Sequence, residues 1–216
     1  MNICHHWFSF QHPTTILVAG PTQAGKTEFV INILNEKNSL FDPPIQNIYW
    51  AYGQKNEKQL QRIQNIEPNI EFIEGCPNLD FINPDETNLL ILDDLMDEIG
   101  KNQACSNLFT RGSHHKNVSV IAIIHNLFNQ QKHSKTISLN TRYYFLFKSP
   151  RDNQQTAYFG RQIFPNAKNF IPAALAIATQ QQYGYLGIDL HTRTLDSFRV
   201  FTGIFRHQIP ILFIPT

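Results

Sequence analysis

A glycine- and lysine-containing motif near the amino terminus has the residue types and spacing of a phosphate-binding loop. It fits the pattern Gly-x-x-x-x-Gly-Lys-Thr and reads Gly20-Pro21-Thr22-Gln23-Ala24-Gly25-Lys26-Thr27. Its two glycines allow backbone conformations in which successive N–H groups point toward a phosphate. The lysine ammonium can reach the terminal phosphates, and the threonine hydroxyl can bind Mg²⁺. We therefore expect residues 20–27 to bind ATP, with Lys26 as a catalytic contact and Thr27 as a metal ligand.

The residues around this motif predict the elements that a phosphate loop needs. Thr15–Ala19 is an apolar run that favours a buried strand directly before the loop. A helix over about 26–36 should follow, because apolar residues recur there at helical spacing: Phe29, Val30, Ile33 and Leu34. The alternative is a glycine turn followed by a lysine by chance, and the order strand, loop, helix argues against it.

A second motif is an apolar run that ends in acidic residues. Four aliphatic residues, 89–92, precede Asp93 and Asp94. Such a run suits a strand buried on both faces of a parallel sheet, and its carboxyl end would lie in the crevice where these sheets bind ligands. We expect Asp93 to hold Mg²⁺ through water and Asp94 to polarise the water that attacks the phosphate. The alternative is that both acids cap the next helix, which carries less weight in a chain with a phosphate loop.

Length and composition favour one globular domain. The chain has 216 residues, of which 42% are hydrophobic. We expect a single α/β domain over 1–216, with a lead-in at 1–13 and a carboxyl-terminal tail at 205–216. The formal net charge is +1, so any contact with DNA would depend on a local basic patch or on patches summed over an oligomer.

The cysteines and the lengths of the apolar runs indicate where in the cell the protein is expected. Cys4, Cys76 and Cys105 lie far apart without a Cys-x-x-Cys spacing, which favours a reducing compartment over a disulfide framework. Cys4-His5-His6 has metal-binding residue types but no second ligand pair, so we interpret it as coincidence. The sequence contains neither a signal peptide nor an apolar run long enough to cross a membrane, and we expect an intracellular protein without a membrane partner.

The rest of the chain alternates between strand and helix patterns. The lead-in aromatics Trp7, Phe8 and Phe10 should pack in the core, and lining an adenine pocket is the less favoured alternative. The 127–138 segment is interpreted as an exposed loop or a short helix, and the apolar 209–214 tail should dock on the body or on a neighbour. Further strands are expected at 47–52, 70–73, 118–124, 143–147, 185–190 and 198–201, and helices at about 57–66, 97–109, 154–164 and 170–181.

Four segments between Leu108 and Asp152 resemble viral genome-packaging ATPases of the FtsK/HerA division. They are residues 108–120, 124–128, 136–142 and 146–152. The likeness extends over about 14–189 and is nearest to the packaging ATPases of Maverick/Polinton elements and adintoviruses, with the poxvirus packaging ATPase a more distant relative. The two nucleotide-binding motifs are not specific to this family, whereas these four segments are.

The resemblance implies a three-layer P-loop NTPase fold of the additional-strand, RecA/FtsK-like type, with a mainly parallel central sheet. Val118–Ile124 would lie between the P-loop strand and the acidic strand. The family usually carries a polar sensor at the end of this inserted strand, often glutamine, and this chain has His125 there. Histidine can also hydrogen-bond a phosphate or the attacking water. Many relatives have glutamate where this chain has Asp94, so the water would have to approach the shorter carboxylate more closely.

The resemblance also implies a function, namely ATP-driven translocation of double-stranded DNA into a viral or transposon capsid. Such a motor would be a homo-oligomeric ring with a capsid or portal partner, in the host nucleus, a cytoplasmic virus factory or the virion. A neighbouring subunit would supply a catalytic arginine, for which we rank Arg111 before Arg142, while Arg151 would serve in cis. Ordinary surface arginines remain the alternative, and the 129–135 segment is either a DNA-facing loop or a solvated one.

Two other functions fit parts of the sequence. A non-motor ATP-binding switch or assembly factor would keep the same fold and motifs but turn over weakly. A kinase would need an arginine-rich lid and an acceptor pocket, which the sequence does not suggest. DNA-stimulated ATPase activity separates the motor from the switch.

Overall fold

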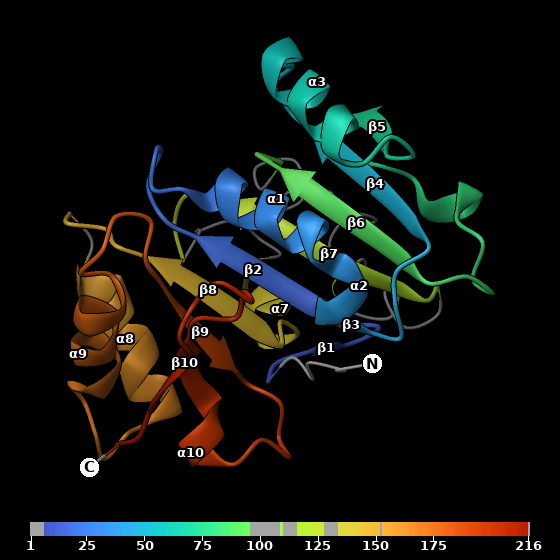
Figure 1. The fold of residues 1–216 in the computed structure, drawn as a ribbon. Helices are drawn as coiled ribbons and strands as arrows, with labels where there is room; N and C mark the ends of the chain where they lie inside the picture. The colour runs from blue at the N-terminus through green and yellow to red at the C-terminus, as the bar shows by residue number, and fades with distance from the viewer. Residues whose placement is uncertain (1–6, 96–108, 110–115, 128–133, 152, 216) are drawn as a thin grey trace.

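A nine-stranded sheet forms the centre of the computed structural model, which describes residues 7–95, 109, 116–127, 134–151 and 153–215 (Figure 1). The strand order is β11-β10-β9-β8-β2-β7-β6-β4-β5. Neighbours from β8 to β5 in this order are parallel, and β8, β9, β10 and β11 are joined antiparallel. The strands are β2 (Thr15–Ala19), β4 (Asn47–Tyr52), β5 (Glu71–Glu74), β6 (Asn88–Asp93), β7 (Val118–Ile124), β8 (Tyr143–Phe147), β9 (Tyr185–Asp189), β10 (Val200–Thr202) and β11 (Ile211–Phe213).

The inserted strand β7 lies between β2 and β6, as the sequence resemblance implied. It pairs in parallel with both neighbours, so that Ile124 is opposite Ala19 and Ile123 is opposite Asp93. All seven residues of β7 are buried, which explains its continuous apolar sequence. This order brings the ends of β2, β7 and β6 to the same end of the sheet, here called the carboxyl end.

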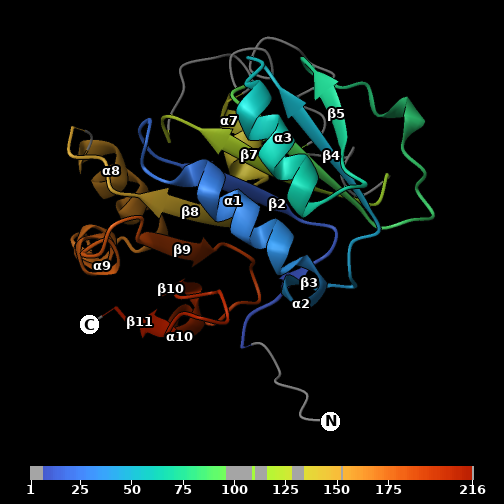
Figure 2. The ribbon, with the colours of Figure 1, turned by 45° about the horizontal axis from the view of Figure 1, so that its top comes forward.

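Helices cover both faces of the sheet and make three layers. Side chains alternate along each strand, so Ile16 and Val18 face one core while Leu17 and Ala19 face the other. Figures 1 and 2 show α1 and α3 together over the first face, whereas α8 and α9 belong to the second. The helices are α1 (Lys26–Asn35), α2 (Lys37–Leu40) and α3 (Glu57–Ile66), then α7 (Ser134–Leu139), α8 (Asn153–Ile163), α9 (Phe170–Ala178) and α10 (Asp196–Arg199). The predicted three-layer α/β fold with a mainly parallel sheet is confirmed.

The aromatic lead-in packs in the core at the opposite end of the sheet, the amino end. Phe8 and Phe10 are buried, and their rings lie 5.8 and 5.0 Å from that of Tyr143, at the start of β8. The Trp7 indole donates a hydrogen bond to the Gly203 carbonyl at 2.8 Å. Core packing was therefore the right interpretation of Phe8 and Phe10, whereas Trp7 is 41% exposed and lies at the margin of the core. A short second sheet, β1 (Phe10–Gln11) with β3 (Phe41–Asp42), adjoins them and was not expected.

The structure differs from the sequence-based expectations at three places. The helix expected over 170–181 ends at Ala178, and the strand expected at 198–201 is instead α10 followed by β10. Cys76 is disulfide-bonded, which goes against the expectation that the cysteines form no disulfide framework, because sequence spacing does not report distance in the fold. The other cysteines, Cys4 and Cys105, lie outside the described residues. In the described part of the chain, no helix is both long and apolar enough to cross a bilayer.

Candidate nucleotide-binding site

The P-loop, residues 20–27, connects β2 to α1 and needs both of its glycines. A Cβ on Gly20 would lie 2.7 Å from the Phe147 Cβ, so no side chain fits between the loop and β8. Gly25 caps α1 with a φ of 99°, and Gln23 also has a positive φ of 65°. Positive φ values are uncommon outside glycine, and they curl this loop so that its N–H groups turn inward.

The backbone N–H groups of the P-loop are available to a ligand. Within the loop, Ala24 N–H donates to the Pro21 carbonyl at 3.2 Å. No acceptor is found within the described residues for the N–H groups of Gln23, Gly25, Lys26 and Thr27. These groups lie at the positive end of the α1 dipole, so the loop can bind an anion such as a phosphate.

The Lys26 side chain is buried beneath the loop. Its ammonium donates to the carbonyls of Gly20 and Pro21 at 2.7 and 2.8 Å. Burial lowers the pKa of this ammonium, and the charges of Asp93 and Asp94 partly oppose that shift. A partly desolvated cation beside a ring of N–H groups suits the terminal phosphates of a nucleotide.

Asp93 ends β6 at the same end of the sheet as the P-loop, with β7 between the two. Its Oδ2 accepts a hydrogen bond of 2.9 Å from Gln59 Nε2, in the first turn of α3. Burial raises the pKa of the Asp93 carboxyl, and the hydrogen bond from Gln59 opposes the shift. The role of Gln59 was missed in the sequence, where the one available signal was Asn56 before α3, whose side chain caps the Gln59 N–H at 3.2 Å.

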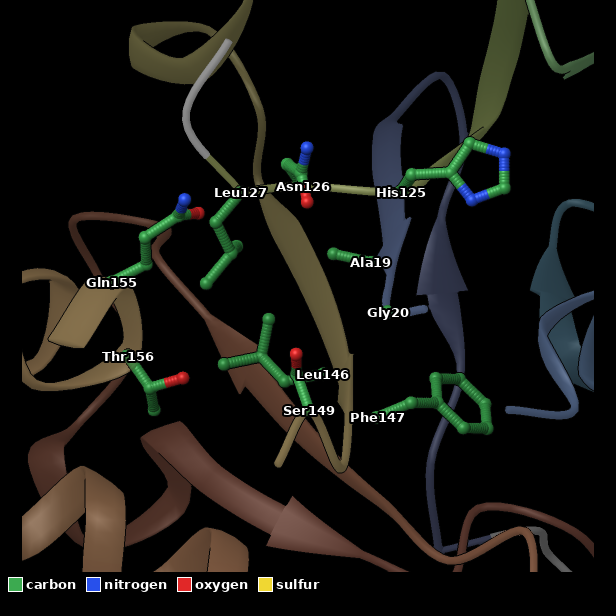
Figure 3. Close-up of a pocket in the computed structure, with 10 residues that line it drawn as sticks. All are labelled: Ala19, Gly20, His125, Asn126, Leu127, Leu146, Phe147, Ser149, Gln155 and Thr156. Carbon is green, nitrogen blue, oxygen red and sulfur yellow. The ribbon is translucent and has the colours of Figure 1, made fainter. Parts of the chain in front are cut away.

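Asp94 and His125 face one another across the ends of β6 and β7. The Nε2 atom of His125 lies 3.2 Å from Oδ1 of Asp94, and about half of each side chain is exposed. Asp94 has a φ of 57°, and a Cβ on Gly53 would lie 2.7 Å from its carbonyl oxygen. In Figure 3 the His125 ring lies on the opposite side of Asn126 from Leu127. The two predicted catalytic side chains are therefore brought together and remain accessible.

A small cavity lies behind the P-loop, between β2, β8 and α8 (Figure 3). Its volume of about 20 Å³ is room for one or two waters and is far too small for a nucleotide. A nucleotide would therefore lie across the outer side of the loop, over the start of α1.

The arginine candidates lie in different places. Arg111 and most of the 129–135 segment fall outside the described residues. Arg142 precedes β8 at the amino end of the sheet, where its Nε lies 3.3 Å from Oδ1 of Asp189. Arg151 is exposed and follows β8 on the P-loop side.

Among the described residues, no group of three or more His, Cys, Asp or Glu could hold a metal ion, and Cys4-His5-His6 lies outside them.

Two solved structures share this fold. The DNA-packaging ATPase B204 from Sulfolobus Turreted Icosahedral Virus matches with a TM-score of 0.56 and 10% identity, over 96% of this chain and all of that one. The genome packaging NTPase B204 from Sulfolobus turreted icosahedral virus 2, solved in complex with ATP-gammaS, matches with a TM-score of 0.53 and 14% identity, over 94% and 97% of the two chains. Neither a protein-family model nor a curated protein matches the sequence. The chain has the fold of a P-loop NTPase.

Proposed function

We propose that this protein is an ATPase that drives double-stranded DNA into a viral or virus-like transposon capsid. The observation that carries the nucleotide chemistry is the juxtaposition of a P-loop with free N–H groups, the buried Lys26 ammonium and the Asp93-Asp94 pair at one end of the sheet. The packaging role is supported by the fold shared with the two B204 proteins and by the resemblance of residues 108–152 to packaging ATPases.

The residues present fit Mg-ATP. The P-loop N–H groups bind the phosphates, and Lys26 exchanges its two carbonyl acceptors for phosphate oxygens. The Thr27 hydroxyl would bind Mg²⁺ and the Asp93 carboxylate would hold it through water, since this hard cation takes oxygen ligands. When bound, Mg²⁺ neutralises charge on the phosphate oxygens. Partial burial raises the pKa of the Asp93 carboxyl, and a divalent cation bound beside it would favour the ionised form.

Asp94 and His125 serve hydrolysis itself. Asp94 orients the attacking water and accepts its proton, and the exposed position of its carboxylate leaves room for that water. His125, 3.2 Å away, holds the Asp94 carboxylate or hydrogen-bonds the water directly. The backbone of Asp94 has a positive φ, which aspartate adopts more readily than most residues and which aims the side chain beyond the end of β6.

The assembly proposed is a homo-oligomeric ring around double-stranded DNA, with a capsid or portal protein as its partner. It would work inside the infected or transposon-bearing cell, in the nucleus or a cytoplasmic virus factory. The formal net charge of +1 favours local basic patches, repeated around a ring, over one strongly basic surface. A neighbouring subunit contributes an arginine to the transition state, with Arg111 ranked first.

An ATPase assay with and without double-stranded DNA tests this function, run beside a mass measurement of the assembly. We expect Mg²⁺-dependent hydrolysis that double-stranded DNA stimulates, in a species larger than the 25.0 kDa monomer. Hydrolysis that DNA leaves unchanged, in a monomeric protein, would make the chain a nucleotide-dependent switch. The control is the Lys26→Ala protein, which should be inactive with DNA or without it.

Mixing two inactive variants tests the shared site. Arg111→Ala protein keeps its P-loop, and Lys26→Ala protein keeps its arginine. If a neighbour supplies Arg111, the mixture regains part of the DNA-stimulated activity that each variant lacks. Parental activity of Arg111→Ala alone would remove that arginine from the mechanism, and the same mixing with Arg142→Ala then tests the second candidate.

A further inference from the structure

The P-loop has a second flank, on the side away from Asp93 and Asp94. There the turn between α9 and β9, residues 179–184, borders a cleft of about 630 Å³. The other walls of the cleft are Gln23 and Ala24 of the P-loop and Lys148, which follows β8. The cleft is open to solvent and continuous with the loop, so a ligand bound on the loop can extend into it.

Tyr183 stands against the P-loop at the edge of this cleft. A Cβ on Gly25 would lie 2.7 Å from Cδ1 of the Tyr183 ring, so the ring occupies the space that a side chain at position 25 would need. The Tyr183 side chain is nonetheless 57% exposed, and its φ is 63°. An aromatic residue held in a rare backbone conformation and left in solvent contributes little to the core, and such strain is frequent at binding sites.

The fold fixes this turn beside the loop. Strand β9 pairs antiparallel with β8, which pairs with the P-loop strand β2, so the start of β9 lies at the carboxyl end. A Cβ on Gly184 would lie 2.3 Å from the Ala178 carbonyl oxygen, so the chain can reverse here only with glycine. The Gly184 N–H also donates to the Gln181 carbonyl at 3.1 Å. Tyr183 is thus held by backbone geometry on both sides.

The turn also presents three amide side chains. Gln180, Gln181 and Gln182 are exposed and line the cleft, and their side-chain amides have no hydrogen-bond partner among the described residues. A glutamine amide carries both a donor and an acceptor, the combination that pairs with the edge of an adenine. The cleft therefore offers an aromatic ring on which a base could stack and amides that could hydrogen-bond to the edge of that base.

Direction along the loop decides which part of a nucleotide reaches this flank. The acids and His125 lie on the β6 and β7 side of the P-loop, whereas the cleft lies on its β8 and β9 side. If the terminal phosphate points toward the acids, the nucleoside must leave the loop on the opposite side. The first cleft that it meets there is the one beneath Tyr183.

We propose that the cleft between the P-loop and the 179–184 turn binds the base of the nucleotide, with Tyr183 stacked on the base and the glutamine amides on its edge. This inference rests on the proposed ATPase function, and it names a base-binding element that the sequence did not reveal. Stacking against an aromatic ring tolerates any base, whereas the amides favour adenine over guanine.

Equilibrium binding by calorimetry tests it, with Mg-ATP and with inorganic tripolyphosphate, which has the same phosphates and no base. Tyr183→Ala should weaken ATP binding about tenfold and leave tripolyphosphate binding unchanged, since base stacking on an aromatic side chain is of this size. Tyr183→Phe should bind ATP like the parent. Phe198→Ala is the matched control, because Phe198 is 56% exposed but lies in α10, away from the P-loop.

The two ligands separate the possible failures. Unchanged ATP affinity in Tyr183→Ala, with parental protein that binds ATP, overturns the base site and leaves the ATPase proposal standing. Equal losses for ATP and tripolyphosphate mean that Tyr183 shapes the P-loop and does not bind the base, which also overturns it. Parental protein that binds neither ligand contradicts the ATPase proposal and the base site together.

The amide contacts are tested by exchanging the base. The parent should bind ATP more tightly than GTP, and the triple variant Gln180→Ala, Gln181→Ala, Gln182→Ala should lose this preference while its tripolyphosphate affinity stays the same. An unchanged preference in a folded triple variant would remove the glutamines from base recognition. A thermal unfolding curve for each variant establishes that it is folded.

Discussion

The two ends of the central sheet use similar residue types in opposite ways. At the carboxyl end, three non-glycine residues have positive φ values: Gln23, Asp94 and Tyr183, at 65°, 57° and 63°. The fourth such residue among the described residues, Asn117 with a φ of 50°, precedes β7 at the amino end. The P-loop N–H groups of Gln23, Gly25, Lys26 and Thr27 have no acceptor among the described residues, and Asp94 and His125 are half exposed. Strained backbone and unsatisfied polar groups each cost free energy, so their concentration at the carboxyl end indicates that this end binds something.

At the amino end, the charged groups bind one another, although Thr14 Oγ1 is buried there without a hydrogen-bond partner among the described residues. Arg142 contacts Asp189, and Asp189 also accepts hydrogen bonds from the His191 N–H and the Thr194 hydroxyl, both at 2.8 Å. Arg199 donates to the carbonyls of Asp189 and Thr194 at 2.8 and 2.7 Å. Charged groups bound in this way stabilise the fold. The difference teaches that residue type alone does not mark a site, whereas several accessible polar groups without partners at one place do.

The largest test of this contrast is Lys26→Ala, at the carboxyl end. We expect it to abolish Mg-ATP hydrolysis, by at least about a hundredfold, because the phosphates lose their main cationic partner. Steady-state ATPase assays measure the loss, and Lys58→Ala, on the surface of α3, is the matched control. Turnover within about tenfold of the parent would contradict the assignment of the P-loop.

Asp94→Asn should separate binding from chemistry. Nucleotide affinity should stay near the parental value while turnover falls at least about a hundredfold, the scale of a general base. Single-turnover hydrolysis and calorimetric binding of ATP give the two quantities. If Asp94→Asn instead abolishes Mg²⁺-dependent binding and Asp93→Asn has the milder effect on turnover, the roles of the two acids are exchanged.

Gln59→Leu should change the metal dependence of the enzyme. Without the 2.9 Å hydrogen bond from Gln59, the Asp93 carboxylate is no longer oriented, and we expect the Mg²⁺ concentration for half-maximal activity to rise about tenfold. Activity at saturating Mg²⁺ should largely recover, which a general structural defect would not allow. Gln61→Leu, exposed on the same helix, should behave like the parent.

Much of the carboxyl end could be predicted from the sequence, because its motifs are short patterns of neighbouring residues. The P-loop spacing, the acids after 89–92 and the buried run of β7 each lie within a few consecutive residues, and β2, β4, β7 and β8 have the predicted bounds. A run of aliphatic residues fixes a buried strand almost regardless of its surroundings.

The parts that could not be predicted depend on pairing between distant segments. Gln59 reaches Asp93 only because β4 and β6 are neighbours, and Tyr183 reaches Gly25 only because β9 pairs with β8. Gln180 and Gln181 are good helix formers and lie in the last three residues of the expected helix, 179–181, which the structure does not make helical. There the tight reversal at Gly184, required by β9, overrides local propensity.

Arg142→Ala tests whether the charged groups at the amino end serve stability and not nucleotide binding. It should lower the free energy of unfolding by about 1–3 kcal/mol, because it leaves the Asp189 carboxylate without its cation. ATP affinity should not change, since Arg142 lies at the opposite end of the sheet from its own P-loop. Chemical denaturation measures the stability, with the exposed Arg161→Ala as control. Full stability combined with lost DNA-stimulated turnover would instead favour Arg142 as the arginine that acts on a neighbour.

The smallest effect expected is a pH dependence of stability from His12, also at the amino end. Asn117 donates its amide N–H to the Glu86 carbonyl at 2.9 Å, so its Oδ1 accepts from His12 Nε2 at 3.0 Å. Ser119 Oγ, 2.7 Å from Nδ1, then donates its hydroxyl hydrogen to the neutral ring. A proton on Nδ1 would force the Ser119 hydroxyl to turn its hydrogen away and accept instead.

Burial of the imidazole lowers the pKa of His12 from its usual 6.5, and the hydrogen bond to Asn117 only partly opposes the shift. The unfolded chain therefore takes up this proton at a higher pH than the folded protein does. Stability from the neutral ring is present above pH 6.5 and is lost as the pH falls through the lowered pKa. Between about pH 7.5 and 5.5, the parent should lose more stability than His12→Gln, which cannot titrate there. If the free energy of unfolding changes with pH equally in the two proteins, the hydrogen bonds of His12 do not favour its neutral form in the folded protein.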